Sequence, residues 1–99
     1  MNVIAPRTVR EFWERHPRAQ EPLRIWLKLM QRTDFANWAE LKAAFPRADY
    51  VSDANLVILN IGGNKYRLIA DVSFRQNRVF IKRILTHAEY DKWNHGGRS

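Results

Sequence analysis

The hydrophobic pattern of this chain changes its period once, close to residue 56. Before that point, apolar residues recur at intervals of three and four, the spacing of amphipathic helices. After it, β-branched and apolar runs alternate with polar residues and are separated by short turns, which is typical of strands. The pattern predicts an α+β domain in which helices pack on one face of an antiparallel sheet.

A short strand and a helical hairpin are predicted for the first third of the chain. The strand spans residues 2–5 and ends at Pro6, a residue accepted at the first position of a helix. That helix stops before Pro17, because the residue preceding a proline disfavours the helical conformation. The same spacing predicts a second helix over residues 19–32, and the short connection makes the two helices antiparallel.

A short third helix is expected between Asn37 and Phe45. Asparagine is a good N-cap, since its side-chain oxygen accepts a backbone N–H of the first turn. Glu40 stands three positions later, which fits a capping box. Residues 46–55 are polar and predict a turn-like connection.

Three strands joined by tight turns are predicted for the second half. They span residues 56–61, 66–74 and 78–85 and should form an antiparallel meander. Residues 62–64 are Gly-Gly-Asn, which accept the positive φ of a tight turn. In the middle strand, alternation places Tyr66, Leu68, Ala70, Val72 and Phe74 on one face, and Arg67, Ile69, Asp71 and Ser73 on the other.

The last predicted helix opens with a second capping box. Thr86 fits its N-cap and Glu89 its third residue, and the helix is expected to end near Trp93. Residues 94–99 include two glycines and are predicted to be a flexible tail. The chain is therefore predicted to form a single domain over residues 1–93, followed by that tail.

The charge of the chain favours a polyanionic partner. Its 17 Lys and Arg against 10 Asp and Glu give a formal net charge of +7, which attracts RNA, DNA, ribosomes or an acidic protein. A basic domain without such a partner is the alternative. The absence of cysteine excludes disulfides, thiolate catalysis and cysteine zinc sites. With no signal-like or membrane-spanning apolar run, a soluble, cytoplasmic protein without a membrane partner is expected.

His87 and Tyr90 are the first candidates for chemistry. His87 is expected at the first position of the last helix, where the helix dipole disfavours an added positive charge and attracts anions. A histidine near neutrality can carry a proton at physiological pH. Tyr90 lies three residues later, on the same helix face. The alternative is that His87 is a surface or capping residue and Tyr90 a core aromatic.

Arg67 is expensive to bury without a partner, so it should face a groove, a carboxylate or solvent. In a groove its guanidinium could clamp a phosphate; otherwise it forms an ion pair or a solubility charge. Lys82 and Arg83 are adjacent in the last strand and are therefore predicted to point to opposite faces, so that only one shares a groove with Arg67. Asn64 and Lys65 at the turn are candidate RNA contacts, as is Arg83.

Several familiar site motifs are absent from the sequence. No spacing of His, Asp and Glu resembles a zinc or calcium motif, so no metal is predicted. The Gly-Gly-Asn-Lys turn does not match the spacing of a phosphate-binding P-loop, and the sequence has no serine nucleophile elbow. No cofactor is predicted.

Three segments carry a resemblance to a known family. They are residues 41–46 (LKAAFP), 60–68 (NIGGNKYRL) and 84–91 (ILTHAEYD), and together with residues 3–5 they extend over nearly the whole chain. The sequence resembles the HigB-type toxins of bacterial type II toxin–antitoxin systems, within the RelE-like superfamily. The resemblance implies a RelE-like fold, in which a helical hairpin packs on a small, mostly antiparallel sheet with a short C-terminal helix.

The resemblance also implies an activity and partners. The activity is that of a metal-independent endoribonuclease that cuts mRNA, commonly in the ribosomal A site, and so inhibits translation. The partner is a helix-turn-helix antitoxin of the HigA type, and the complex would bind operator DNA mainly through the antitoxin. Codon preference and oligomeric state do not follow from it.

Residue roles follow from the same resemblance. Arg67 matches the middle-strand arginine that stabilises the pentacoordinate phosphate. His87 lies where some relatives carry a histidine for proton transfer, and Tyr90 matches an aromatic residue near the scissile base. Lys82 is a fourth catalytic candidate, although Lys82 and Lys65 match only as nearby basic residues. We therefore expect the RNA 2′-hydroxyl to attack the adjacent phosphate and leave a 2′,3′-cyclic phosphate.

Two further functions stay open at the level of the sequence. A non-catalytic RNA- or ribosome-binding module would use the same basic groove, but His87 would then be dispensable. A protein-interaction domain without nucleic acid would bind polyanions with weak salt dependence.

Overall fold

The computed structural model describes residues 1–52 and 54–95. It confirms the α+β class, with helices first and most strands later in the chain. In chain order the elements are β1 (Asn2–Ile4), α1 (Pro6–Arg15), a 3₁₀ turn (Pro17–Ala19), α2 (Gln20–Arg32), α3 (Trp38–Ala44), β2 (Asp49–Val51), β3 (Leu56–Ile61), β4 (Tyr66–Ser73), β5 (Arg78–Thr86) and α4 (His87–His95).

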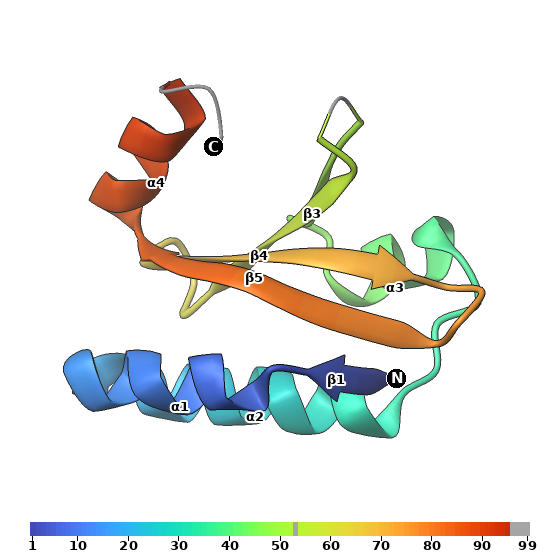
Figure 1. The fold of residues 1–99 in the computed structure, drawn as a ribbon, viewed down its shortest axis with the longest axis horizontal. Coiled ribbons are helices and arrows are strands. Elements are labelled where there is room, and N and C mark those ends of the chain that lie inside the picture. The colour runs from blue at the N-terminus through green and yellow to red at the C-terminus, as the bar shows by residue number, and fades with distance from the viewer. Residues whose placement is uncertain (53, 96–99) are drawn as a thin grey trace.

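The strands form one mixed sheet in the order β1-β5-β4-β3-β2 (Figure 1). The predicted meander is confirmed, since β3 pairs antiparallel with β4 and β4 antiparallel with β5. β1 adds to the free side of β5 in a parallel pairing. The long connection from β1 to β5 includes both helices of the hairpin, as a parallel pairing requires.

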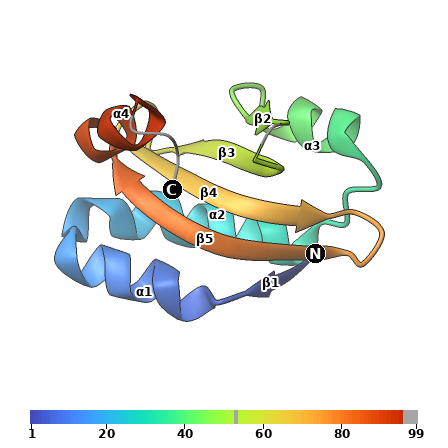
Figure 2. The same ribbon diagram turned by 45° about the horizontal axis from the view of Figure 1, so that its top comes forward.

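The core lies between the sheet and the helical hairpin. α1 and α2 run antiparallel on one face of the sheet (Figures 1 and 2). Val9 and Phe12 of α1, and Leu23 and Met30 of α2, are almost completely buried there. The sheet contributes the predicted face of β4, with Tyr66, Leu68 and Ala70 in the same cluster of buried residues.

Hydrogen bonds connect the end of α2 and the residues just after it to the first residue of the chain and to the β4–β5 turn. The Met1 α-amino group donates hydrogen bonds to the carbonyl oxygens of Met30, at 2.8 Å, and Thr33, at 2.6 Å. Asp34 accepts from the side chain of Asn77 at 3.0 Å and lies 3.1 Å from the same amino group. The Asn77 hydrogen bond, followed by the amino group, lowers the pKa of the Asp34 carboxyl.

The structure corrects the prediction for residues 46–55, because they include the strand β2. β2 pairs with the first half of β3 at the edge of the sheet. Its three residues are exposed or half-buried, so they show none of the alternation that identifies a strand in sequence. Pairing with β3, rather than local propensity, decides their conformation.

The prediction that all helices pack on one face is wrong for α4. α4 stands on the side of the sheet opposite α1 and α2 (Figures 1 and 2). None of its residues is fully buried, so its sequence carries little information on the face that it covers. The helix also extends to His95, two residues past the predicted end, and the rest of the predicted tail (96–99) lies outside the described residues.

A bulge in β5 overturns the prediction that Lys82 and Arg83 point to opposite faces. Ile69 of β4 is opposite Arg83, and the next residue, Ala70, is opposite Ile81, so Lys82 is an extra residue in β5. A bulge interrupts the alternation of side chains. Lys82 and Arg83 are consequently both exposed, between the buried residues Ile81 and Ile84.

Candidate active site

The turn between β3 and β4 and the start of α4 are held together at one end of the sheet. Gly62 and Gly63 adopt positive φ values of 64° and 71°, as predicted for this turn. The backbone N–H of His87 donates to the carbonyl oxygen of Lys65 at 3.0 Å. The first turn of α4 therefore sits directly beside the residues that lead into β4.

The predicted capping box at α4 is confirmed. The Glu89 N–H donates to Thr86 Oγ1 at 3.2 Å, and the Thr86 N–H donates to Glu89 Oε1 at 2.9 Å. Thr86 is itself opposite Tyr66 in the β4–β5 ladder. The reciprocal bonds satisfy two backbone donors that a helix start leaves free and so fix where α4 leaves the sheet.

Removing the hydroxyl in Thr86→Ala is expected to lower the free energy of unfolding by about 0.5–2 kcal/mol, because the Glu89 N–H loses its acceptor. Urea unfolding of the purified protein measures this. Thr86→Ser keeps the hydroxyl and should remain close to the original stability. Equal stability of the alanine and serine variants would show that the cap contributes nothing.

Arg67 is buried at this end of the sheet, with 8% of its surface exposed. Its Nη1 donates to the carbonyl oxygens of Asn64 and Tyr66, both at 3.2 Å, and its Nη2 donates to Asn64 Oδ1. These acceptors are all neutral. They orient the guanidinium but do not neutralise its positive charge.

No carboxylate neutralises Arg67 in the part of the chain that the structure describes, where the recorded salt bridges are those of Met1 with Asp34 and of His87 with Asp91. Among the described residues, Arg67 therefore does not form the ion pair that was one alternative for it. A buried cation without a counter-charge loses hydration and gains no pairing energy. Such a site favours an incoming anion, and a planar guanidinium suits a phosphate.

Tyr90 of α4 covers the guanidinium. The Cζ atom of Arg67 lies 5.3 Å from the centre of the Tyr90 ring, within the range of a cation–π contact. Trp93 continues this aromatic surface, with its ring centre 5.9 Å from that of Tyr90. Tyr90 is half-buried and does not belong to the cluster of buried core residues. The alternative that it is a core aromatic is therefore wrong.

His87 is the first residue of α4, as predicted, and its side chain is 48% exposed. It lies two positions beyond Leu85, the residue opposite Arg67 in the sheet. Its Nδ1 is 3.4 Å from Oδ2 of Asp91. A carboxylate at this distance orients the imidazole ring.

Asp91 is a candidate that the sequence reasoning missed. It follows His87 by four residues, the spacing at which two side chains meet on one helix face. The four-residue spacing of His87 and Asp91 is visible in the sequence. It indicates a functional pair only because the structure places α4 beside Arg67.

The remaining basic candidates lie around this centre at different positions. Lys65 is exposed at the β3–β4 turn, next to Asn64. Arg83 is opposite Ile69, on the same face of the sheet as Arg67. Lys82 lies further along β5, and its Nζ is 4.9 Å from the centre of the exposed Phe80 ring. The structure thus brings Arg67, Asn64 and Tyr90 together, with Lys82 outside this group.

Two negative observations apply to residues 1–52 and 54–95. They contain no group of three or more His, Asp or Glu side chains suited to holding a metal ion. Among these residues, no helix has both the length and the apolar character needed to cross a membrane.

A family model described as the RelE-like toxic component of a toxin–antitoxin system, HigB toxin, matches residues 19–93. The chain belongs to the HigB toxin family. A protein of Escherichia coli O6:H1 strain CFT073 named "mRNA interferase HigB" is 34% identical over 93 residues, which cover 93% of this chain and 90% of that protein. An "mRNA interferase toxin HigB" of E. coli strain K12 is 28% identical over 92 residues, which cover 92% of this chain and 88% of the relative.

Membership of the HigB family confirms the resemblance seen in the sequence. The match of residues 19–93 includes all of β2–β5 and most of α4, so the Arg67 site lies wholly inside it. As a HigB-type toxin, the chain has an antitoxin as its partner.

Proposed function

We propose that this toxin cuts mRNA as an endoribonuclease and thereby inhibits translation. The names of two relatives, both mRNA interferases, support this activity. The observation that carries the proposal is the buried guanidinium of Arg67, held by Asn64 and Tyr66 but paired with no described carboxylate. A fixed, uncompensated cation is the group that a phosphoryl transition state needs.

In the proposed reaction, the 2′-hydroxyl of one nucleotide attacks the adjacent phosphorus. A base removes the hydroxyl proton as the O2′–P bond forms, and an acid protonates the 5′-oxygen as the P–O5′ bond breaks. The products are a 2′,3′-cyclic phosphate and a 5′-hydroxyl. Arg67 stabilises the negative charge that the phosphoryl oxygens carry in the transition state.

The proton carrier in this proposal is His87, with Asp91 orienting its imidazole. Tyr90, which lies over Arg67, offers a ring on which the base beside the cut can stack. Lys65, Lys82 and Arg83 are exposed and would hold the flanking RNA backbone through its phosphates. The mechanism draws on side chains alone and needs no metal or cofactor.

The finer partner assignments are part of the same proposal. Cleavage takes place on the ribosome, at the A site, in the cytoplasm. The antitoxin is a helix-turn-helix protein of the HigA type, and the toxin contacts operator DNA only through it.

The decisive experiment maps mRNA ends after the toxin is added to purified translating ribosomes. New ends with a 2′,3′-cyclic phosphate and a 5′-hydroxyl are expected. A transcript with a 2′-deoxy nucleotide at the mapped cut should stay intact there, because the attacking group is missing. Binding to ribosomes without new ends would contradict the enzyme and favour the non-catalytic RNA-binding module.

A further inference from the structure

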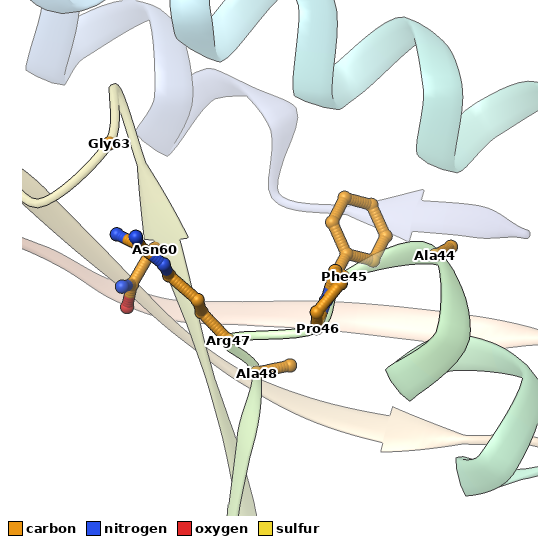
Figure 3. A pocket seen from close by; sticks show the side chains of 7 residues that line it. All are labelled: Ala44, Phe45, Pro46, Arg47, Ala48, Asn60 and Gly63. Carbon is orange, nitrogen blue, oxygen red and sulfur yellow. The ribbon is translucent and has the colours of Figure 1, made fainter.

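A cavity of about 430 Å³ opens beside the candidate active site. It lies between the segment that follows α3 and the end of β3 with its turn. Its lining residues are Ala44, Phe45, Pro46, Arg47, Ala48, Asn60 and Gly63. In Figure 3 the Arg47 side chain extends from its loop toward Asn60 and the turn at Gly63. The volume falls within the range of about 300–1,000 Å³ that is typical of small-ligand sites.

The cavity adjoins the Arg67 site through two backbone connections. Asn60 is directly opposite Arg67 in the β3–β4 ladder, so the two side chains project from the same face, one strand apart. Gly63 precedes Asn64, the residue that holds the Arg67 guanidinium. Asn60 and the turn at Gly63 therefore belong both to the wall of this cavity and to the surroundings of Arg67.

The polar groups of the cavity have unused hydrogen-bonding capacity. Arg47 is exposed, and within residues 1–52 and 54–95 it forms no salt bridge. Asn60 is half-buried, and no other described residue binds its side-chain amide. An amide both donates and accepts hydrogen bonds, as reading the edge of a base requires.

The other lining residues suit a nucleobase and no competing charge is present. Phe45 and Pro46 supply an apolar wall, and no acidic residue lines the cavity. By contrast, the cavity of about 350 Å³ along α1 is lined by Thr8, Glu11, Glu14 and Arg15, so two carboxylates there outweigh a single cation and repel a phosphate. The cavity at Arg47 is therefore the better suited of these two to a nucleotide.

We propose that this cavity binds the mRNA nucleotide next to the one that is cut. The base enters between Pro46 and the turn, Asn60 hydrogen-bonds to its edge, and Arg47 contacts its phosphate. The proposal rests on the proposed function and adds a determinant of sequence preference. Arg47 is a substrate-binding residue here and takes no part in proton transfer.

A binding experiment tests the contact of Arg47 with phosphate. The probe is a short single-stranded RNA with 2′-fluoro groups, which block attack, and its affinity is measured by fluorescence anisotropy at several salt concentrations. Arg47→Gln should make the slope of log K against log salt shallower by about 0.7, the value for one phosphate contact on a single strand. The control Arg10→Gln removes an exposed cation of α1 and should leave the slope unchanged.

A cleavage experiment tests the role of Asn60. In the ribosome assay, Asn60→Ala should reduce the ratio of cleavage rates between preferred and other nucleotides at one position beside the cut by about tenfold. A merely structural role would lower cleavage at all sites equally. Arg47 lies on an exposed loop, so Arg47→Gln should fold normally. The binding experiment therefore still tests the cavity if Asn60→Ala, a substitution within β3, unfolds the protein.

The outcomes separate the two proposals. If the wild-type toxin produces no mRNA ends, the endoribonuclease fails, while the salt slopes still test the cavity. If it cuts mRNA but both variants match wild type in slope and preference, the cavity proposal is overturned and the enzyme stands. Loss of antitoxin binding with unchanged RNA binding would also overturn it, by assigning the cavity to the antitoxin.

Discussion

Replacing Arg67 with methionine is expected to slow mRNA cleavage by about 10²–10³-fold, the usual cost of removing one donor that stabilises a transition-state charge. Methionine keeps an unbranched side chain in a position that is 8% exposed, so the sheet should form normally. Single-turnover cleavage of ribosome-bound mRNA measures the rate. The loss should be in the rate constant more than in apparent affinity, because the charge on the phosphate grows in the transition state.

The same variant carries a second expectation, on stability. The buried guanidinium has no described carboxylate partner, so its removal also removes a desolvation cost. The free energy of unfolding should be unchanged or higher than that of the wild type. Activity that falls while stability holds identifies a residue kept for function.

Arg78→Met is the matched control for the Arg67 variant. Arg78 is exposed at the opposite end of β5, where it is opposite Ser73. Its substitution should change neither the cleavage rate nor the stability appreciably. Wild-type cleavage by the Arg67→Met protein would contradict the role of Arg67 in catalysis.

Phe12→Ala is expected to lower the free energy of unfolding by about 3–5 kcal/mol, the cost of emptying a buried aromatic site. Phe12 is 2% exposed. Its ring stacks on His16, with centres 4.4 Å apart, and meets Tyr66 edge-on at 5.6 Å. Domains of this size have a total stability of roughly 5–15 kcal/mol, so a large share would be lost.

Urea unfolding followed by tryptophan fluorescence measures this loss. Ile25→Ala is the control, because Ile25 belongs to the neighbouring helix α2 but is 60% exposed. It should change the free energy of unfolding by no more than about 0.5 kcal/mol. Similar losses for the two variants would contradict the placement of the core between α1 and β4.

Local patterns in the sequence predicted the elements that local chemistry controls. Asn37 accepts the Glu40 N–H at 3.0 Å at the start of α3, and Thr86 and Glu89 cap α4 reciprocally. Both were expected, since a cap depends on residues three positions apart. The strand β2 escaped prediction, because its conformation depends on pairing with β3.

The site was predictable as a set of residues but not as an arrangement. Arg67 and Tyr90 stood out as a cation on a strand and an aromatic residue on a helix, and the structure places them 5.3 Å apart. For Lys82 and Arg83, the alternation of side chains in the sequence could not decide which of the two lies on the same face of the sheet as Arg67. The bulge at Lys82 decided it by leaving both exposed.

The sequence by itself determined the order of the helices and of every strand except β2, the tight Gly-Gly turn, the two capped helices and the membership of the HigB family. These features depend on interactions within a few residues or on direct similarity. Only the tertiary structure decided that α4 lies opposite the helical hairpin, that Tyr90 covers Arg67, and that Arg47 and Asn60 share a cavity. Such contacts join residues far apart in the chain, and burial and pairing, rather than local propensity, choose among the ways of making them.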